Sequence, residues 1–145
     1  MKDEDLLQKA ISIAFEAHKD QLDKYGAPYL GHVTRVMNAG TTIEEKILGV
    51  LHDVVEDASW TFEQLEKEGF PANIIEALKC VTKKSDDEDY DEFVERTKQN
   101  KLAVKVKLND LTDNMDIKRM SEIKADDLPR LNKYLKAFKT LKGIV

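Results

Sequence analysis

Residues 51–57, with the sequence LHDVVED, combine side chains that readily bind a metal ion or activate water. If the segment is helical, His52 and Glu56 share one face, while Asp53 and Asp57 share another face about 100° away. The four polar groups would then form one broad patch on a helix whose other sides are apolar. Because charged groups on a largely buried helix need partners, a bound cation would satisfy them. His52 and Asp53 would supply ligands, and Glu56 and Asp57 could handle a proton or a water molecule.

A metal site in an enzyme needs more than two ligands, so other donors must come from elsewhere in the chain. His32 follows a turn, and Asp110 lies in a polar interruption of an otherwise apolar helix. Together with His52 and Asp53 they would form a mixed nitrogen and oxygen site, which suits Mn²⁺, Fe²⁺ or a neighbouring divalent ion. This set lacks the thiolates of structural zinc, but composition does not choose the metal. The third histidine, His18, ends an amphipathic helix and is more typical of a packed or capping residue.

Apolar residues recur at helical spacing through most of the chain, and six Gly and three Pro punctuate it. The pattern predicts helices at 4–19, 32–39, from a cap at Thr41 or Thr42 to before Ser59, at 61–68, 72–82, 89–99, 102–119 and 127–142. Residues 102–108 alternate apolar and polar side chains, so a strand is the local alternative there. We favour a helix because no partner strand with hairpin signals lies nearby. The sequence therefore predicts a single compact all-α domain over residues 1–145, with the metal site between helices.

Composition and charge limit the classes of function. The chain has 145 residues, 41% of them hydrophobic, which fits one globular domain with its own core. Its formal net charge of −5 argues against nucleic acid as a partner, which would require an excess of positive charge. The single cysteine, Cys80, excludes an intramolecular disulfide and fits a reducing compartment. The acidic start and the lack of a long apolar stretch predict a soluble cytoplasmic protein with no membrane partner.

Several motifs, in order along the chain, carry a resemblance to a known family. They are AHKDQ at 17–21, GAPYLGH at 26–32, LHDVVED at 51–57, VT at 81–82, KLND at 107–110 and NM at 114–115. Together they resemble the HD-domain hydrolases of the RelA/SpoT type, including the small alarmone hydrolases, over nearly the whole chain. The resemblance implies an all-α HD fold, one Mn²⁺ ion, and removal of the 3′-pyrophosphate from guanosine tetra- or pentaphosphate.

The resemblance also implies a role for each matching residue. It places the metal on His32, His52, Asp53 and Asp110. It assigns the activation of water to Glu56 and Asp57, and contacts with the nucleotide or its phosphates to Lys24, Asn114 and Tyr134. This division agrees with the chemistry, since a metal lowers the pKa of water and an adjacent carboxylate can orient the water and take its proton.

Some positions depart from the family pattern around this core. Leu22 and Asp23 stand where the family usually has two basic residues, one of which stacks on the guanine base. Val33 replaces the proline that normally follows the metal-binding histidine. In the last motif, Leu111 and Asp113 stand where the family has arginine and histidine. The metal and catalytic residues are therefore intact, whereas recognition of the base and the phosphates is altered.

Two alternative functions remain open. The same phosphohydrolase chemistry could act on a different nucleotide, an alternative that Leu22 and Asp23 favour. The chain could also be a non-catalytic sensor module that binds metal and nucleotide, although a pure binder has no need of both Glu56 and Asp57. The sequence does not predict an oligomeric state.

Overall fold

The structure is a computed structural model that describes residues 2–144. Its helices are α1 (Asp3–His18), α2 (Tyr29–Ala39), α3 (Ile43–Leu51), α4 (Val54–Asp57), α5 (Phe62–Lys67), α6 (Ala72–Val81), α7 (Tyr90–Thr97), α8 (Lys101–Asn114), the 3₁₀ helix η1 (Ile117–Arg119) and α9 (Asp127–Lys142). Within residues 2–144 the only extended pairing is one isolated antiparallel bridge, between Leu22 and Pro28. The prediction of an all-α fold is confirmed.

Short polar side chains set the starts of the helices that matter most for the site. Thr42 caps α3, because its hydroxyl accepts a hydrogen bond from the Glu45 amide at 3.2 Å. Asn100 caps α8 in the same way, accepting from the Ala103 amide at 2.9 Å. Of the two caps considered for α3, the structure uses Thr42. The alternating segment 102–108 lies inside α8, which confirms the helix prediction there.

The helix predicted to run from residue 42 to before residue 59 is broken in the structure. α3 ends at Leu51, and the chain makes a turn at His52 and Asp53 before α4 begins. A side-chain contact explains the break, because Nδ1 of His52 donates to the Gly49 carbonyl oxygen at 2.6 Å. In an unbroken helix that oxygen would accept from the amide of residue 53. The prediction of one continuous helix was therefore wrong, although Asp53 and Asp57 keep helical spacing, because the Asp57 amide donates to the Asp53 carbonyl oxygen at 2.9 Å.

The largest of the other differences from the predicted helix ends are at the start of α2 and the end of α8. α2 begins at Tyr29 rather than at residue 32, directly after Pro28, whose extended backbone forms the N-cap. The helix predicted over 102–119 stops at Asn114, and η1 follows. The Asp116 side chain accepts from the Lys118 amide at 3.1 Å, which favours a short 3₁₀ turn over continuation of α8.

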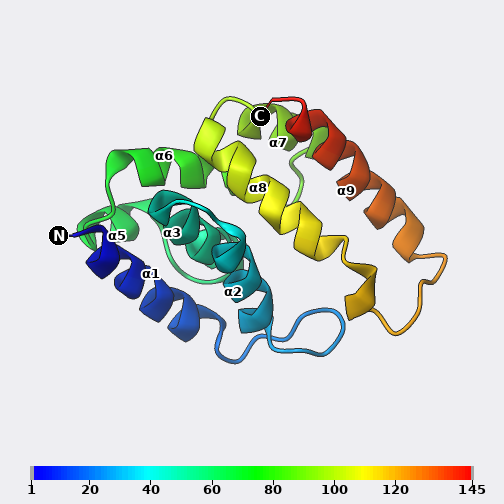
Figure 1. Cartoon of the computed structure of the whole chain (residues 1–145), viewed down its shortest axis with the longest axis horizontal. Helices are drawn as coiled ribbons and strands as arrows, with labels where there is room; N and C mark the ends of the chain where they lie inside the picture. Colours follow the sequence, from blue (N-terminus) through cyan, green and yellow to red (C-terminus); the bar gives the residue numbers. More distant parts are fainter. Residues whose placement is uncertain (1, 145) are drawn as a thin grey trace.

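Two hydrophobic clusters form the interior, and α8 belongs to both. The larger one is built mainly by α1, α2, α3, α5 and α6, and it includes Ala103 and Val106 of α8. The smaller one packs α9 against α7 and α8 through residues that include Leu111 and Leu141. Figure 1 shows α9 running alongside α8, with α1, α2 and α3 on the other side of α8. This arrangement brings α2, the α3–α4 turn and α8 next to one another.

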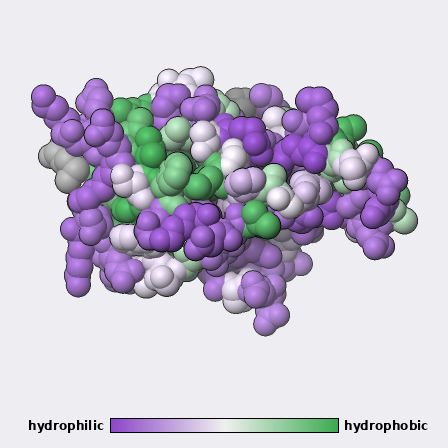
Figure 2. Space-filling model, turned by 90° about the horizontal axis from the view of Figure 1, so that it is seen from below, coloured by the Kyte–Doolittle hydropathy of each residue, from purple (hydrophilic) through white to green (hydrophobic). Residues whose placement is uncertain are grey.

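Hydrophilic side chains cover most of the face drawn in Figure 2, and hydrophobic side chains form separate patches between them. The exposed large hydrophobic residues include Phe15 of α1 and both Leu128 and Leu135 of α9.

None of the helices within residues 2–144 combines the length and the apolar character that crossing a membrane requires.

Candidate metal centre and active site

Four side chains predicted as metal ligands meet between α2, the α3–α4 turn and α8. Nε2 of His32 lies 2.9 Å from Oδ1 of Asp110 and 3.8 Å from Oδ2 of Asp53. Nε2 of His52 lies 3.0 Å from Oδ2 of Asp53 and 3.2 Å from Oδ1 of Asp110. Ligand atoms of His32, His52 and Asp53 all lie within 4.8 Å of one another. Two imidazole nitrogens and two carboxylates thus converge on one small volume.

The orientation of the two histidines fits a cation. Nδ1 of His52 faces the Gly49 carbonyl oxygen at 2.6 Å, and Nδ1 of His32 faces Oδ2 of Asp113 at 2.6 Å. Both oxygens only accept, so each Nδ1 carries a hydrogen, and each imidazole would direct an Nε2 lone pair at the cluster once a cation is bound there. Although burial lowers the pKa of His52, the carboxylates of Asp53 and Asp110 raise it well above its ordinary value. The cluster therefore favours a positive charge, which a divalent metal ion would supply.

Tyr29 and Lys107 support the carboxylate ligands, and the sequence analysis assigned them no role. The Tyr29 hydroxyl donates to Oδ2 of Asp53, and burial together with this carboxylate raises the pKa of Tyr29. Nζ of Lys107 lies 2.9 Å from Oδ2 of Asp110. Burial lowers the pKa of Lys107, but Asp110 outweighs it and keeps the ammonium charged. The i, i+3 spacing of Lys107 and Asp110 within a predicted helix was a signal that could have identified this pair.

Glu56 and Asp57, the predicted catalytic residues, lie in α4 and line a cavity that His32, Asp53 and Asp110 also line. Burial raises the pKa of Glu56, although its Oε1 accepts from the Lys83 amide at 2.8 Å. Burial and the nearby Asp53 raise the pKa of Asp57. Partly desolvated carboxylates with raised pKa values are well suited to exchanging a proton with water.

A cavity of about 300 Å³ opens from the cluster, and basic side chains form much of the rest of its wall. The cationic side chains that line it are Lys24, Lys83, Lys107, Arg119, Arg130 and Lys133. Burial, and then repulsion from Arg130 and Lys133, lowers the pKa of the Lys24 ammonium. The acidic cluster and the basic wall together make a cavity that suits a ligand with several phosphate groups.

The three predicted substrate-binding residues, Lys24, Asn114 and Tyr134, all line this cavity. Asn114 also supports the cluster, because its Nδ2 donates to Oδ1 of Asp110 at 3.1 Å. His18 is fully buried, and its Nδ1 lies 2.7 Å from Oε1 of Gln21, in agreement with a packed histidine.

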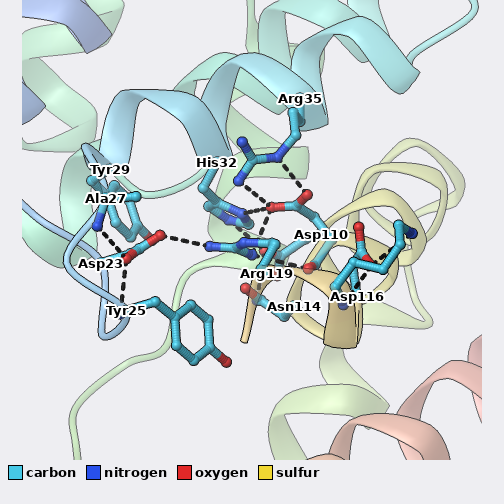
Figure 3. Close-up of polar contacts among 12 residues, drawn as sticks. Asp23, Tyr25, Ala27, Tyr29, His32, Arg35, Asp110, Asn114, Asp116 and Arg119 are labelled. Atoms are coloured by element: carbon cyan, nitrogen blue, oxygen red, sulfur yellow. Dashed lines mark hydrogen bonds and ion pairs between the residues drawn. The ribbon is translucent and has the colours of Figure 1, made fainter. Parts of the chain in front are cut away.

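Three residues that depart from the family pattern, Leu22, Asp23 and Asp113, lie at the cavity or bind residues that line it. Leu22 is 62% exposed at its rim. Asp113 is the hydrogen-bond partner of His32, and Asp23 pairs with Arg119 at 3.0 Å. Figure 3 shows how Arg119 lies between Asp23 on one side and the residues around His32 on the other. These acidic positions are thus part of a connected polar network.

Comparison with known proteins gives relatives by sequence. No family model matches the chain. The chain is 31% identical over 120 residues to the guanosine-3′,5′-bis(diphosphate) 3′-pyrophosphohydrolase of Aquifex aeolicus, an alignment that covers 75% of this chain and 17% of that protein. It is 30% identical over 135 residues to the putative chloroplastic GTP diphosphokinase RSH1 of Arabidopsis thaliana, covering 90% of this chain and 13% of that protein. The chain therefore spans less than one fifth of the length of these relatives.

The fold is similar to that of a solved structure described as a metazoan orthologue of SpoT that hydrolyses ppGpp. The TM-score is 0.79 at 22% sequence identity, and the match covers 96% of this chain and 86% of the other. The likeness at this identity establishes the fold, and the Aquifex relative carries the similarity in sequence. By sequence the chain is similar to part of the ppGpp 3′-pyrophosphohydrolase of Aquifex aeolicus, and by fold it is similar to the solved metazoan structure.

Proposed function

We propose that the chain is a metal-dependent phosphohydrolase that removes the 3′-pyrophosphate from guanosine tetra- or pentaphosphate. The observation that supports this most directly is the His–Asp cluster, placed beside two partly buried carboxylates at one end of a cavity with a basic wall. The relative from Aquifex aeolicus is named for the same reaction. We propose Mn²⁺ as the ion and a cytoplasmic location.

In this proposal the side chains divide the reaction between them. His32, His52, Asp53 and Asp110 hold the ion. A divalent ion bound there acts as a Lewis acid towards phosphoryl oxygens and lowers the pKa of water. Lys24, Asn114 and Tyr134, which line the same cavity, bind the nucleotide. Their placement orients the pyrophosphate towards Glu56 and Asp57.

The hydrolytic step is a transfer of the pyrophosphoryl group to water. Glu56 and Asp57 orient a water molecule and accept one of its protons. The water oxygen forms a bond to the phosphorus atom nearest the ribose, and the bond between that phosphorus and the 3′-oxygen breaks. The proton held by the carboxylate then passes to the 3′-oxygen. The products are pyrophosphate and a guanosine 5′-di- or triphosphate.

The test is to remove metal with a chelator, add back Mn²⁺, and measure pyrophosphate and orthophosphate release from guanosine tetraphosphate beside a panel of other nucleotides. We expect pyrophosphate in equal amount to guanosine diphosphate, and no release without metal. Asp53→Ala should lose both metal binding and turnover. Glu56→Gln should keep the metal and lose about 100-fold or more in rate. The exposed Glu63→Gln in α5 is a matched control.

Other outcomes would redirect the proposal. Activity on another nucleotide alone would keep the chemistry and reject the alarmone, an alternative favoured by Leu22 and by the pairing of Asp23 with Arg119. Binding of metal and nucleotide without any product would point to a sensor module. Full activity in Asp53→Ala would overturn the assignment of the site.

A further inference from the structure

Arg119 of η1 joins two carboxylates that lie far apart in the sequence. Its guanidinium lies 3.0 Å from Oδ2 of Asp23 and 2.9 Å from Oδ2 of Asp113, and it also donates to the Asp113 carbonyl oxygen at 2.9 Å. The Arg119 side chain is 14% exposed. The guanidinium already binds Asp23 on one side and Asp113 on the other. Arg119 therefore holds two protein segments together, and its charge is already paired where it lines the cavity.

One end of this bridge reaches the metal ligand His32. Oδ2 of Asp113 accepts from Nδ1 of His32 at 2.6 Å, and Oδ1 of the same carboxylate accepts from Nε of Arg35 at 2.7 Å. Two guanidinium groups and one imidazole therefore fix the Asp113 carboxylate. A carboxylate held in this way fixes the ring orientation and the tautomer of the histidine that it contacts.

The other end of the bridge holds the loop of residues 22–28. Oδ1 of Asp23 accepts from the amides of Tyr25 and Ala27, each at 2.9 Å, and closes a turn in which Gly26 adopts a φ of +85°. The Arg119 guanidinium also lies over the Tyr25 ring, 5.4 Å from its centroid. This turn carries Lys24, which lines the cavity. Figure 3 shows the loop, Arg119 and His32 as one continuous network.

We propose that Arg119 is a positioning residue that couples the 22–28 loop to His32, so that metal binding orders the loop and nucleotide binding strengthens the hold on the metal. The inference deepens the proposed function and relies on it for the nature of the ligand. Coupling of this kind is reciprocal, since each ligand changes the affinity for the other by the same factor. Asp23 and Asp113 then act together, because the coupling requires Arg119 to bind both carboxylates.

The test compares Arg119→Ala and Arg119→Lys with Lys118→Ala, which removes an 85% exposed cation from the same 3₁₀ helix. Mn²⁺ affinity is measured by electron paramagnetic resonance of the free ion, and amide hydrogen exchange of residues 22–28 is measured with and without Mn²⁺. In the natural chain and in Lys118→Ala, we expect Mn²⁺ to slow exchange in this loop. In Arg119→Ala, we expect about 10-fold weaker Mn²⁺ binding and no slowing. Arg119→Lys should lie between the two.

A double-mutant cycle tests whether Asp23 and Arg119 act through the same contact. Asp23→Asn should speed amide hydrogen exchange in the loop. Combined with Arg119→Ala, it should change neither Mn²⁺ affinity nor amide exchange beyond the effect of Arg119→Ala alone. Unchanged Mn²⁺ affinity in Arg119→Ala, or slowing that persists in it, would overturn the coupling. If Arg119→Ala fails to fold without metal, Mn²⁺ affinity and loop exchange are compared between the natural chain and the Arg119→Lys and Asp23→Asn variants instead. Because neither readout requires turnover, a chain that binds Mn²⁺ but hydrolyses nothing would reject the proposed function and leave this test intact.

Discussion

A single buried ammonium shapes the electrostatics of the candidate site at the residue scale. Lys107 lies 2.9 Å from Asp110 and its Nζ also packs over the Phe93 ring, 5.0 Å from the centroid. Asp53 and Asp110 both belong to the His–Asp cluster, and Glu56 and Asp57 are close by. Their negative charges repel one another when no cation is bound, so Lys107 offsets part of that repulsion in the metal-free protein.

Replacing this lysine should make folding depend more strongly on metal. We expect Lys107→Met to lower the free energy of unfolding of the metal-free protein by about 3 kcal/mol, because Oδ2 of the buried Asp110 carboxylate loses its cationic partner. Mn²⁺ should then stabilise the variant more than it stabilises the natural chain. Urea unfolding with and without Mn²⁺ measures both effects, and Lys105→Met, an exposed position of the same helix, is the control. Equal stabilisation by Mn²⁺ in both proteins would contradict the idea.

The sequence predicted which four side chains come together, but it did not predict the residues that support them. The convergence of the four proposed ligands follows from motifs whose residue types and order are distinctive, and the structure brings them together. The supporting contacts were not predicted, because they join residues that are far apart in the chain. Asp113 bonds to His32 across 81 positions, and Arg119 bonds to Asp23 across 96. No local pattern specifies such partners, and the acidic residues 23 and 113 were noticed only as departures.

At the scale of an element, the break between α3 and α4 is another feature that the local sequence pattern did not predict. Apolar periodicity through residues 47–55 predicted one helix, and no proline or glycine follows Gly49 to interrupt it. The interruption comes from the His52 side chain, which takes the carbonyl oxygen of Gly49. The periodicity of apolar residues indicates which face of a helix is buried. It does not indicate whether a side chain will take the place of a backbone amide at a carbonyl oxygen. The resulting turn nevertheless places His52 and Asp53 side by side at the cluster.

The start of α3 offers a prediction about pH. Glu45 is 5% exposed, and its carboxylate accepts from the Thr41 amide at 3.3 Å and from the Thr42 hydroxyl at 3.0 Å. Burial raises the pKa of Glu45, but these hydrogen bonds outweigh it and hold the pKa below its ordinary value of 4.5. The ionised carboxylate therefore stabilises the fold above that pH, and this stability is lost as the pH falls through the lower folded value.

We expect Glu45→Gln to cost on the order of 1 kcal/mol at pH 7, and to cost progressively less as the pH falls below 4.5. Urea unfolding at a series of pH values measures this difference. Glu44→Gln removes the same charge from the same helical turn and serves as the control. If Glu45→Gln costs as much in acid as at neutral pH, packing rather than charge explains the role of Glu45.

At the scale of the whole molecule, the cavity lies where the two hydrophobic clusters meet. The proposed metal ligands come from α2, the α3–α4 turn and α8, which belong to the larger cluster or border it. Three residues that line the cavity, Arg130, Lys133 and Tyr134, belong to α9, which packs in the smaller cluster. In the proposed function, metal binding would therefore depend mainly on the larger cluster, and nucleotide contacts from α9 on the smaller one, with α8 joining the two.

Two fully buried leucines test this division, because each belongs to one cluster only. Leu141→Ala and Leu65→Ala should each lower the free energy of unfolding by about 2–5 kcal/mol. Leu141→Ala should speed hydrogen exchange mainly in α9 and raise the KM for the nucleotide, while Mn²⁺ affinity stays within about two-fold of its original value. Leu65→Ala should leave KM unchanged. Equal effects of the two variants on exchange in α9 and on KM would mean that the two clusters open as one unit, because α8 would then transmit the loss of packing from either cluster to the cavity.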